Sequence, residues 1–219
     1  MNDKAVIFDL DGTLLNTLDD LADSTNFALS SLKYPQKTLE EIRNFVGNGV
    51  AKLIERAIPQ GIQNPNFEKC LTIFKQYYSQ NMYNKTKPYD GIIEMLTELR
   101  NQGCKVAVVS NKFDAAVKEL CKKYFDNLVD IAIGEDEVHG IKKKPAPDTV
   151  NKVLELFSAK KEDSIYVGDS DVDIMTAKNS ELSCISVTWG FRDIDFLKQH
   201  GADIIIDKPE QLLDCLNNN

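Results

Sequence analysis

The sequence predicts an α/β protein in which a doubly wound parallel sheet carries an inserted, all-helical segment. The first apolar run, residues 5–8, has no polar alternation, as expected of a strand covered on both faces. Residues 16–86 show helical spacing and no strand pattern, whereas strands and helices alternate after them, which is typical of a parallel sheet. We therefore expect a catalytic core from residues 1–15 and 87–219, and a helical domain from residues 16–86.

The inserted segment contains four helical patterns. Apolar residues recur every three or four positions after Leu15, and Asn16 or Thr17 can cap the first helix. The next patterns cover residues 39–46, 50–57 and about 67–83, all without an intervening strand. A wholly helical stretch inside an α/β chain indicates a separate domain.

The rest of the chain alternates regularly between the two kinds of element. Helices are expected over residues 92–99, 115–124, 149–157 and 174–179, with Asp148 as the cap of the third. Strands are expected over residues 105–110, 128–134, 164–168, 184–188 and 202–206. This alternation predicts that the strands run parallel.

Composition limits the partners that the protein can have. The 219 residues include 27% charged and 42% hydrophobic ones, which is typical of a soluble globular protein, and the net charge of −8 disfavours nonspecific binding to nucleic acid or a membrane surface. No apolar run approaches the roughly 18 residues of a membrane helix, and no signal region precedes the first strand. The five scattered cysteines suit a reducing compartment. We expect a cytoplasmic protein, monomeric by default, with a dimer as the alternative.

Two acids follow the first strand directly, at the edge of the sheet where α/β proteins bind ligands. Asp9 and Asp11 are two positions apart, so an extended chain points both carboxylates to one side, where they repel each other without a cation or a shared proton. Gly12 permits a sharp turn and brings backbone N–H groups close to a ligand. A surface turn is the simplest alternative. A calcium loop is a weaker one, because Asp20 stands at the twelfth position, where that loop requires a Glu.

Two further strands end in residues that can bind an anion. Ser110 and Asn111 can donate hydrogen bonds to a phosphate oxygen, although such residues more often cap a helix. Lys144 precedes Pro145, which restricts it to an extended conformation that can aim its ammonium inward. The preceding lysines, 142–143, are expected on a solvated surface.

A fourth strand ends in a cluster of acids. Asp169, Asp171 and Asp173 follow it within five positions, and the first and last share a face if a helical turn begins there. Acids that complement a helix dipole are the alternative, which suits Asp171 but is costly for all three because like charges accumulate.

In this order, and each after a strand, these residues resemble the four motifs of the haloacid dehalogenase-like hydrolases. The matching residues are Asp9 and Asp11, Ser110, Lys144, and Gly168-Asp169 with Asp173. The resemblance covers the whole chain, since this superfamily places a type-1 helical cap directly after its first motif. It implies a Rossmann-like core with residues 16–86 as the cap domain.

The resemblance also implies a phosphatase mechanism. Asp9 is the implied nucleophile, which forms an aspartyl-phosphate, and Asp11 is the implied acid and base. Mg²⁺ is expected on the carboxylates of Asp9 and Asp169 and the backbone carbonyl of Asp11, while Asp173 orients Lys144 or a metal-bound water. The implied ligands of the phosphoryl group are Ser110, Asn111, Lys144 and Gly12. The presence of Asp11 favours phosphoryl chemistry, because the dehalogenases of the superfamily lack this second acid.

Several segments resemble the phosphoglycolate phosphatase branch of this superfamily. They are residues 46–49 with 55–57, 109–112, 187–190 and 201–203. The expected substrate is a small phosphorylated metabolite, with Arg43 or Asn48 of the cap as its contacts and Lys52 as a weaker candidate. Fold and core motifs do not determine the substrate.

Four alternatives to that function stay open. They are a pyrophosphatase, a β-phosphoglucomutase-like phosphotransferase, a phosphonate hydrolase, and a phosphate-binding module without catalysis. The phosphonate hydrolase would need a Schiff-base lysine in the cap, for which Lys33, Lys37 and Lys52 are unsupported candidates. The module would need the loss of a core group, and none of these groups is missing from the sequence.

Overall fold

A computed structural model describes residues 4–136 and 140–217 of the chain. The chain divides into two compact units. Unit 1 consists of Met1–Leu15 and Pro88–Asn219, and unit 2 is Asn16–Lys87. The chain passes between the units through two short strands, β2 (Leu15–Asn16) and β3 (Lys87–Pro88), which form a two-stranded sheet.

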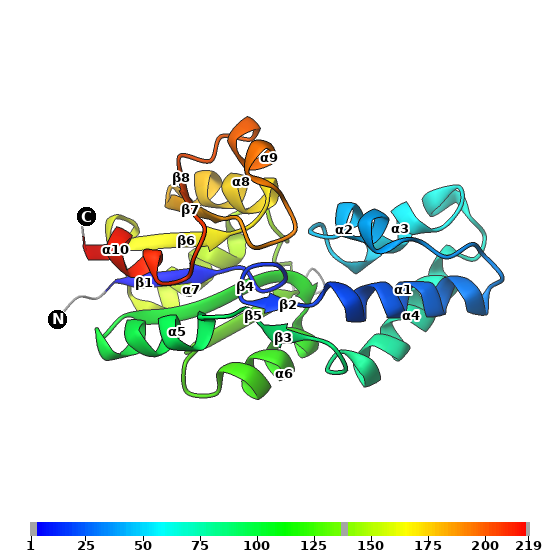
Figure 1. Cartoon of the computed structure of the whole chain (residues 1–219), viewed down its shortest axis with the longest axis horizontal. Coiled ribbons are helices and arrows are strands. Elements are labelled where there is room, and N and C mark those ends of the chain that lie inside the picture. The colour runs from blue at the N-terminus through cyan, green and yellow to red at the C-terminus, as the bar shows by residue number, and fades with distance from the viewer. Residues whose placement is uncertain (1–3, 137–139, 218–219) are drawn as a thin grey trace. The chain divides into compact units, whose positions relative to one another are not determined.

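Unit 1 is built on a six-stranded parallel sheet with the strand order β5-β4-β1-β6-β7-β8 (Figure 1). The strands are β1 (Ala5–Phe8), β4 (Lys105–Phe113), β5 (Ile131–Glu135), β6 (Ser164–Gly168), β7 (Ser183–Val187) and β8 (Ile204–Ile206). At the end of β1, Phe8 lies opposite Val108 of β4 and Val167 of β6. The residues that follow β1 therefore lie beside those that follow β6.

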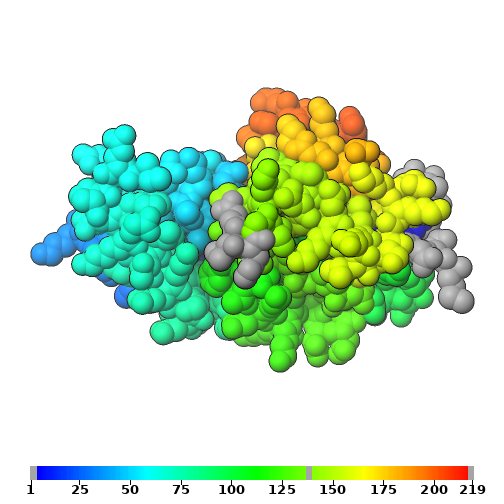
Figure 2. Space-filling view, turned by 180° about the vertical axis from the view of Figure 1, so that it is seen from behind, coloured from blue at the N-terminus to red at the C-terminus, as the bar shows by residue number. Residues whose placement is uncertain are grey.

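Helices cover both faces of this sheet. They are α5 (Ile92–Asn101), α6 (Asp114–Phe125), α7 (Asp148–Phe157), α8 (Asp171–Ser180), α9 (Ile194–Gln199) and α10 (Gln211–Asn217). From β1 the chain moves through β4 to β5 at one edge of the sheet. It then returns to β6, beside β1, and moves through β7 to β8 at the other edge. Right-handed crossovers consequently place α5 and α6 on one face and α7 and α8 on the other. Figure 2 shows the side on which α7 and α8, in yellow to gold, reach the surface. The point of reversal lies between β1 and β6, which is where α/β sheets bind ligands.

The sheet is buried on both faces, as the unalternating apolar strands predict. All four residues of β1 are at most 1% exposed. One face packs against α7 and α8 in a single cluster that includes Ile7, Val109, Val153 and Ala177. This continuous burial explains why β1 carries no polar residue until Asp9, where the strand ends.

Unit 2 consists of four α-helices and a short 3₁₀ turn. The helices are α1 (Leu18–Ser31), α2 (Leu39–Phe45), α3 (Val50–Ala57) and α4 (Phe67–Asn81). Asp20 is buried in α1 and accepts hydrogen bonds from the backbone N–H groups of Lys85 and Thr86 at 2.8–3.1 Å. This carboxylate ties the last residues of the unit to its first helix.

The predicted α/β fold with its doubly wound parallel sheet is confirmed, with local differences in where elements begin and end. Strand β4 runs to Phe113, because Ser110–Lys112 lie buried within it. Strand β5 starts at Ile131, because the N–H groups of Leu128 and Val129 form a turn with the Phe125 carbonyl. Asp148 is the first residue of α7, not its cap, and α8 begins three residues earlier than expected. Helices α9 and α10, of six and seven residues, were not predicted.

Across residues 4–136 and 140–217, no helix is both long and apolar enough to cross a membrane.

Candidate active site

Three buried acids meet at the carboxyl ends of β1 and β6. Asp9 directly follows β1, and its N–H donates to the Val167 carbonyl at 2.9 Å. Asp169 directly follows β6, and Asp173 lies in the first turn of α8. One carboxylate oxygen of each acid lies within 4.8 Å of the others. The parallel register therefore brings together acids that are far apart in the sequence.

Lys144 contacts two of these acids, Asp9 and Asp173. Its Nζ is 2.7 Å from Asp9 Oδ1, 2.8 Å from Asp173 Oδ1 and 3.0 Å from the hydroxyl of Tyr166. The Tyr166 hydroxyl in turn donates to Asp173 Oδ1 at 3.1 Å. Asn111 fixes the lysine backbone, because its Nδ2 donates to the Lys144 carbonyl at 3.0 Å. The side chain thus has three polar contacts although Lys144 is only 4% exposed.

The buried carboxylates are held in an unfavourable environment. Burial raises the pKa of Asp9 to about 7, and the Lys144 ammonium opposes this shift. Burial, together with the charges of Asp173 and Asp9, raises the pKa of Asp169 well above its usual range. Burial lowers the pKa of Lys144, but the carboxylates of Asp173 and Asp9 more than offset this effect and raise it well above its ordinary value. The cluster consequently combines three carboxylates with one firmly charged ammonium.

The loop after β7 completes the surroundings of Asp169. Phe191 N–H donates to Asp169 Oδ2 at 2.7 Å, and the Trp189 indole N–H donates to the Thr13 carbonyl at 3.0 Å. A Cβ added at Gly190 would overlap the side chain of Asp169, and one added at Gly12 would do the same. Both positions must therefore be glycine for Asp169 to occupy its place.

Gly12 leaves space for the side chain of Asp169. Its N–H donates to the Leu15 carbonyl at 2.9 Å, and its φ of +92° favours glycine. The absent side chain leaves room for Asp169, and the expected phosphate-binding role of Gly12 stays a prediction.

Asp11 lies apart from the three-acid cluster and pairs with a second lysine. Lys112 Nζ is 2.8 Å from Asp11 Oδ1 and 3.0 Å from Oδ2. Ser110 stands on the same strand, and its hydroxyl oxygen accepts the backbone N–H of Lys112 at 3.2 Å. The hydroxyl hydrogen of Ser110 therefore remains to be donated to another group.

The two substrate-binding candidates in unit 2 already have local contacts. Arg43 Nε lies 3.7 Å from Glu40 Oε2 on helix α2. Asn48 Oδ1 accepts a hydrogen bond of 2.8 Å from Arg56, whose guanidinium also donates to the Phe45 carbonyl at 2.7 Å. Arg56 thereby holds the loop between α2 and α3, which gives it a structural role that sequence reasoning did not assign.

The lysines that precede Lys144 differ from it in exposure. Lys142 is exposed, and its backbone N–H donates to Asp148 Oδ1 at 3.3 Å. Lys143 is half-buried.

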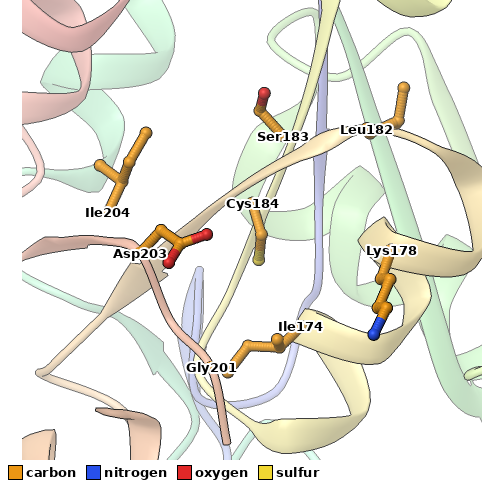
Figure 3. A pocket seen from close by; sticks show the side chains of 8 residues that line it. All are labelled: Ile174, Lys178, Leu182, Ser183, Cys184, Gly201, Asp203 and Ile204. Atoms are coloured by element: carbon orange, nitrogen blue, oxygen red, sulfur yellow. The ribbon is translucent and has the colours of Figure 1, made fainter.

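A separate cavity of about 500 Å³ lies at the amino-terminal ends of strands β7 and β8 (Figure 3). Ser183 and Cys184 begin β7 and Ile204 begins β8, so these lining residues mark the amino ends of their strands. Asp203 and Lys178 also line the cavity. The catalytic candidates follow the carboxyl ends of the strands, so this cavity is separate from them.

Sequence reasoning did not assign site roles to Tyr166, Lys112 or the Trp189–Phe191 loop. Tyr166 stands in an apolar strand, where its hydroxyl is the only hint of a polar role. Lys112 follows Ser110 and Asn111, so its place in a polar strand end was a usable signal.

The fold and the site together define a class of α/β enzyme. In this class, acids lie where the strand order of a parallel sheet reverses, here between β1 and β6. The chain belongs to the haloacid dehalogenase-like hydrolase family, whose model matches residues 6–187.

Individual relatives match over almost the whole chain. A phosphoglycolate phosphatase from Vibrio parahaemolyticus is 32% identical over 224 residues, which cover 97% of this chain and 96% of that protein. The pyrophosphatase PpaX from Bacillus mycoides is 28% identical and covers 99% of this chain and 98% of its own. A crystal structure from Lactobacillus delbrueckii subsp. bulgaricus is 36% identical, with a TM-score of 0.92 and coverage of 99% of each chain.

Proposed function

We propose that the protein is a Mg²⁺-dependent phosphomonoester hydrolase that acts on 2-phosphoglycolate through an aspartyl-phosphate. The observation that carries this proposal is the buried cluster of Asp9, Asp169 and Asp173, with Lys144 paired to Asp9 and Asp173. Asp11 lies two residues beyond Asp9. Carboxylate attack on phosphorus divides one difficult displacement into two easier ones. The relatives named phosphoglycolate phosphatase support the choice of substrate.

A divalent cation fits this cluster on electrostatic grounds. Three buried carboxylates against one ammonium leave two negative charges, and burying such charges without compensation is costly. Carboxylate and carbonyl oxygens are the ligands that Mg²⁺ prefers. We assign the carboxylates of Asp9 and Asp169 and the backbone carbonyl of Asp11 as its protein ligands. When bound, Mg²⁺ supplies positive charge that screens the attack of one anion on another.

The first step transfers the phosphoryl group to the protein. A carboxylate oxygen of Asp9 forms a bond to phosphorus while the bond from phosphorus to the ester oxygen breaks. Asp11 gives its proton to that oxygen, so that the leaving group departs as a neutral alcohol. Lys144, held by Asp173 and Tyr166, balances the charge that accumulates on the phosphoryl oxygens.

The second step regenerates the enzyme. Asp11, now a carboxylate, takes a proton from a water molecule while the water oxygen attacks phosphorus. The bond between phosphorus and Asp9 breaks, which releases inorganic phosphate and restores both acids to their starting forms. One proton passes through Asp11 in each direction, so the cycle consumes only the ester and water.

The phosphoryl group is bound from strand β4 and the loop that carries Lys144. Ser110 is suited to this role because its hydroxyl hydrogen is not used by Lys112. Asn111 contributes by holding the Lys144 backbone. Its side-chain amide is also a candidate donor of a hydrogen bond to a phosphoryl oxygen. Asp173 acts by orienting Lys144, which its contact of 2.8 Å supports.

Substrate selection is assigned to unit 2 as a cap domain, with Arg43 and Asn48 as contacts for the glycolate carboxylate. Arginine suits a carboxylate because its guanidinium can donate two parallel hydrogen bonds. The Arg56 contacts with Asn48 and Phe45 support a shaped loop at this point. We further propose a cytoplasmic protein, which its five reduced thiols favour, that acts on a small metabolite as a monomer by default.

Pyrophosphate hydrolysis is the second candidate, because PpaX matches the chain over nearly its full length. The same core groups can attack pyrophosphate, since phosphate then replaces the alkoxide as leaving group. A mutase or a non-catalytic module has no specific observation in its favour.

Initial rates on a panel of phosphorylated compounds with Mg²⁺ would test the proposal. The panel contains 2-phosphoglycolate, sugar phosphates, nucleoside monophosphates and pyrophosphate, with Asp9→Asn as the blank. We expect 2-phosphoglycolate to exceed the others by about a hundredfold in kcat/KM, which corresponds to roughly 2.7 kcal/mol of transition-state binding. Preference for pyrophosphate would favour the second candidate, and no turnover of any compound by folded protein would refute a phosphatase.

A further inference from the structure

One buried charged group has no part in the chemistry derived above. Among the described residues only two lysines are buried, Lys144 and Lys112, each 4% exposed. Lys144 contacts Asp9, whereas Lys112 of β4 contacts Asp11, two residues after Asp9. Burying a lysine costs several kcal/mol unless a well-formed ion pair compensates it, and an apolar residue of similar size often serves stability equally well. A stabilising role alone therefore does not account for its presence.

The contact between Lys112 and Asp11 is well formed. The ammonium lies at hydrogen-bonding distance from both carboxylate oxygens, at 2.8 and 3.0 Å, and the side chains are 2% and 18% exposed. The backbone of Lys112 is itself held, because its N–H donates to Ser110. Strand β4 continues past Val108, the partner of Phe8, which carries Lys112 alongside the chain that follows β1.

We propose that Lys112 is a positioning residue that fixes the Asp11 carboxyl group for proton transfer. This inference rests on the proposed phosphatase function. A carboxyl group on a single side chain has rotational freedom, and a contact to both of its oxygens restricts that freedom at the atom that exchanges the proton. Lys112 forms no bond to phosphorus and exchanges no proton with the substrate. Asp11 still donates its proton to the ester oxygen, and the ammonium pairs with the carboxylate that this step leaves. That carboxylate later accepts a proton from water, so the balance of the two steps is unchanged.

Each of the two motif acids, Asp9 and Asp11, thus forms an ion pair with a different lysine. Lys144 contacts Asp9 at 2.7 Å and Lys112 contacts Asp11 at 2.8 Å, and the two contacts come from different elements. The nucleophile and the proton carrier are adjacent in sequence but are fixed independently. Loss of the second contact should therefore damage proton transfer and spare the binding of phosphate.

The test compares two leaving groups in the variant Lys112→Met. The kcat/KM for 2-phosphoglycolate includes protonation of a poor alkoxide leaving group, whereas p-nitrophenolate leaves without protonation. We expect the ratio of kcat/KM for 2-phosphoglycolate to that for p-nitrophenyl phosphate to fall about tenfold. This is part of the hundredfold or more that general acid catalysis provides. Both rates come from one preparation, so partial misfolding cancels from the ratio.

Two controls isolate the contact. Lys118→Met removes a lysine from the ion pair with Asp114, where the lysine side chain is 62% exposed, and should leave the ratio unchanged. In an Asp11→Asn background, Lys112→Met should lower the ratio by less than about twofold, because the group it positions is already gone. The inhibition constant of inorganic phosphate should also stay within about twofold of the wild-type value.

Three results would overturn the inference, and they differ from a failure of the proposed function. An unchanged ratio would mean that Lys112 does not act through Asp11. A tenfold rise in the phosphate inhibition constant would mean that Lys112 binds the phosphoryl group directly. Additive effects of Lys112→Met and Asp11→Asn would mean that the two side chains act independently. If the proposed function itself failed, the wild-type enzyme would be inactive on both substrates.

Discussion

The hydroxyl of Tyr166 offers a sharp test of how Lys144 is held, through the variant Tyr166→Phe. The side chain is fully buried, and its oxygen accepts from Lys144 Nζ at 3.0 Å and donates to Asp173 Oδ1 at 3.1 Å. Phenylalanine keeps the ring and its packing and removes only these two hydrogen bonds. The lysine and Asp173 keep their direct contact of 2.8 Å.

The expected loss follows from these contacts. A hydrogen bond to a charged group contributes about 1.5–3 kcal/mol. The O–H···O distance is long and the charged partners retain each other, so we expect about 2 kcal/mol in total. For a chain of this size that corresponds to a decrease of about 4–8 °C in Tm. Looser positioning of Lys144 should cost about 1.4 kcal/mol in transition-state binding, which is about tenfold in kcat/KM.

Thermal unfolding and initial rates measure both effects, with Tyr34→Phe as the matched control. The Tyr34 hydroxyl contacts Asn64 and Asn66 at 3.0 Å within unit 2, so the same atom is deleted from a neutral network. That control should lose about 1 kcal/mol and keep its kcat/KM. Wild-type Tm and wild-type kcat/KM in Tyr166→Phe would refute the role assigned to the hydroxyl.

Four further predictions concern the metal and the two units. Exhaustive treatment with EDTA should abolish phosphatase activity and added Mg²⁺ should restore it, and full activity of the treated enzyme would contradict the metal role. Because burial raises the pKa of Asp9 from 3.8 to about 7, the metal-free protein should lose stability as the pH rises through that window. Mg²⁺ should accordingly bind about tenfold more weakly at pH 6 than at pH 8, and equal affinities in titrations of the Trp189 fluorescence would contradict this. Gly190→Ala should weaken Mg²⁺ binding at least about tenfold, because its Cβ overlaps Asp169, and unaltered affinity by calorimetry would argue against the close packing. Asp20→Ala should destabilise unit 2 by about 2 kcal/mol in urea unfolding, since two backbone N–H groups lose their acceptor, and an unchanged midpoint would show that water replaces it.

The fold and the ends of the strands could be predicted from the sequence because the signals are local. An apolar run that stops at Asp9, and another that stops at Asp169, each identify a buried strand and its end. Parallel pairing then brings these ends together, as the register of Phe8 with Val167 shows. The alternation of elements was sufficient for the sheet, although the short helices α9 and α10 were too brief to produce a periodic signal.

The supporting contacts could not be predicted because they join distant parts of the chain. Trp189 donates to the Thr13 carbonyl across 176 positions, and Lys112 reaches Asp11 across 101. No local pattern identifies such partners. Tyr166 illustrates a second reason, since alternation along a strand assigns a side chain to a face but not to a polar partner within it. The hydrogen bond from the Gly12 N–H to the Leu15 carbonyl was likewise not evident from the sequence.

The paired strands β2 and β3 have a consequence for how such proteins diverge. The chain leaves unit 1 at Leu15 and returns at Pro88 through neighbouring strands, so the segment between them has adjoining ends. Segments with adjoining ends can be inserted or replaced with little disturbance to the host fold. The acids and lysines of the candidate active site all lie outside this segment. Natural recombination, or a chimera built in the laboratory, can therefore exchange unit 2 as one contiguous piece while the acids and lysines of the candidate active site are inherited intact.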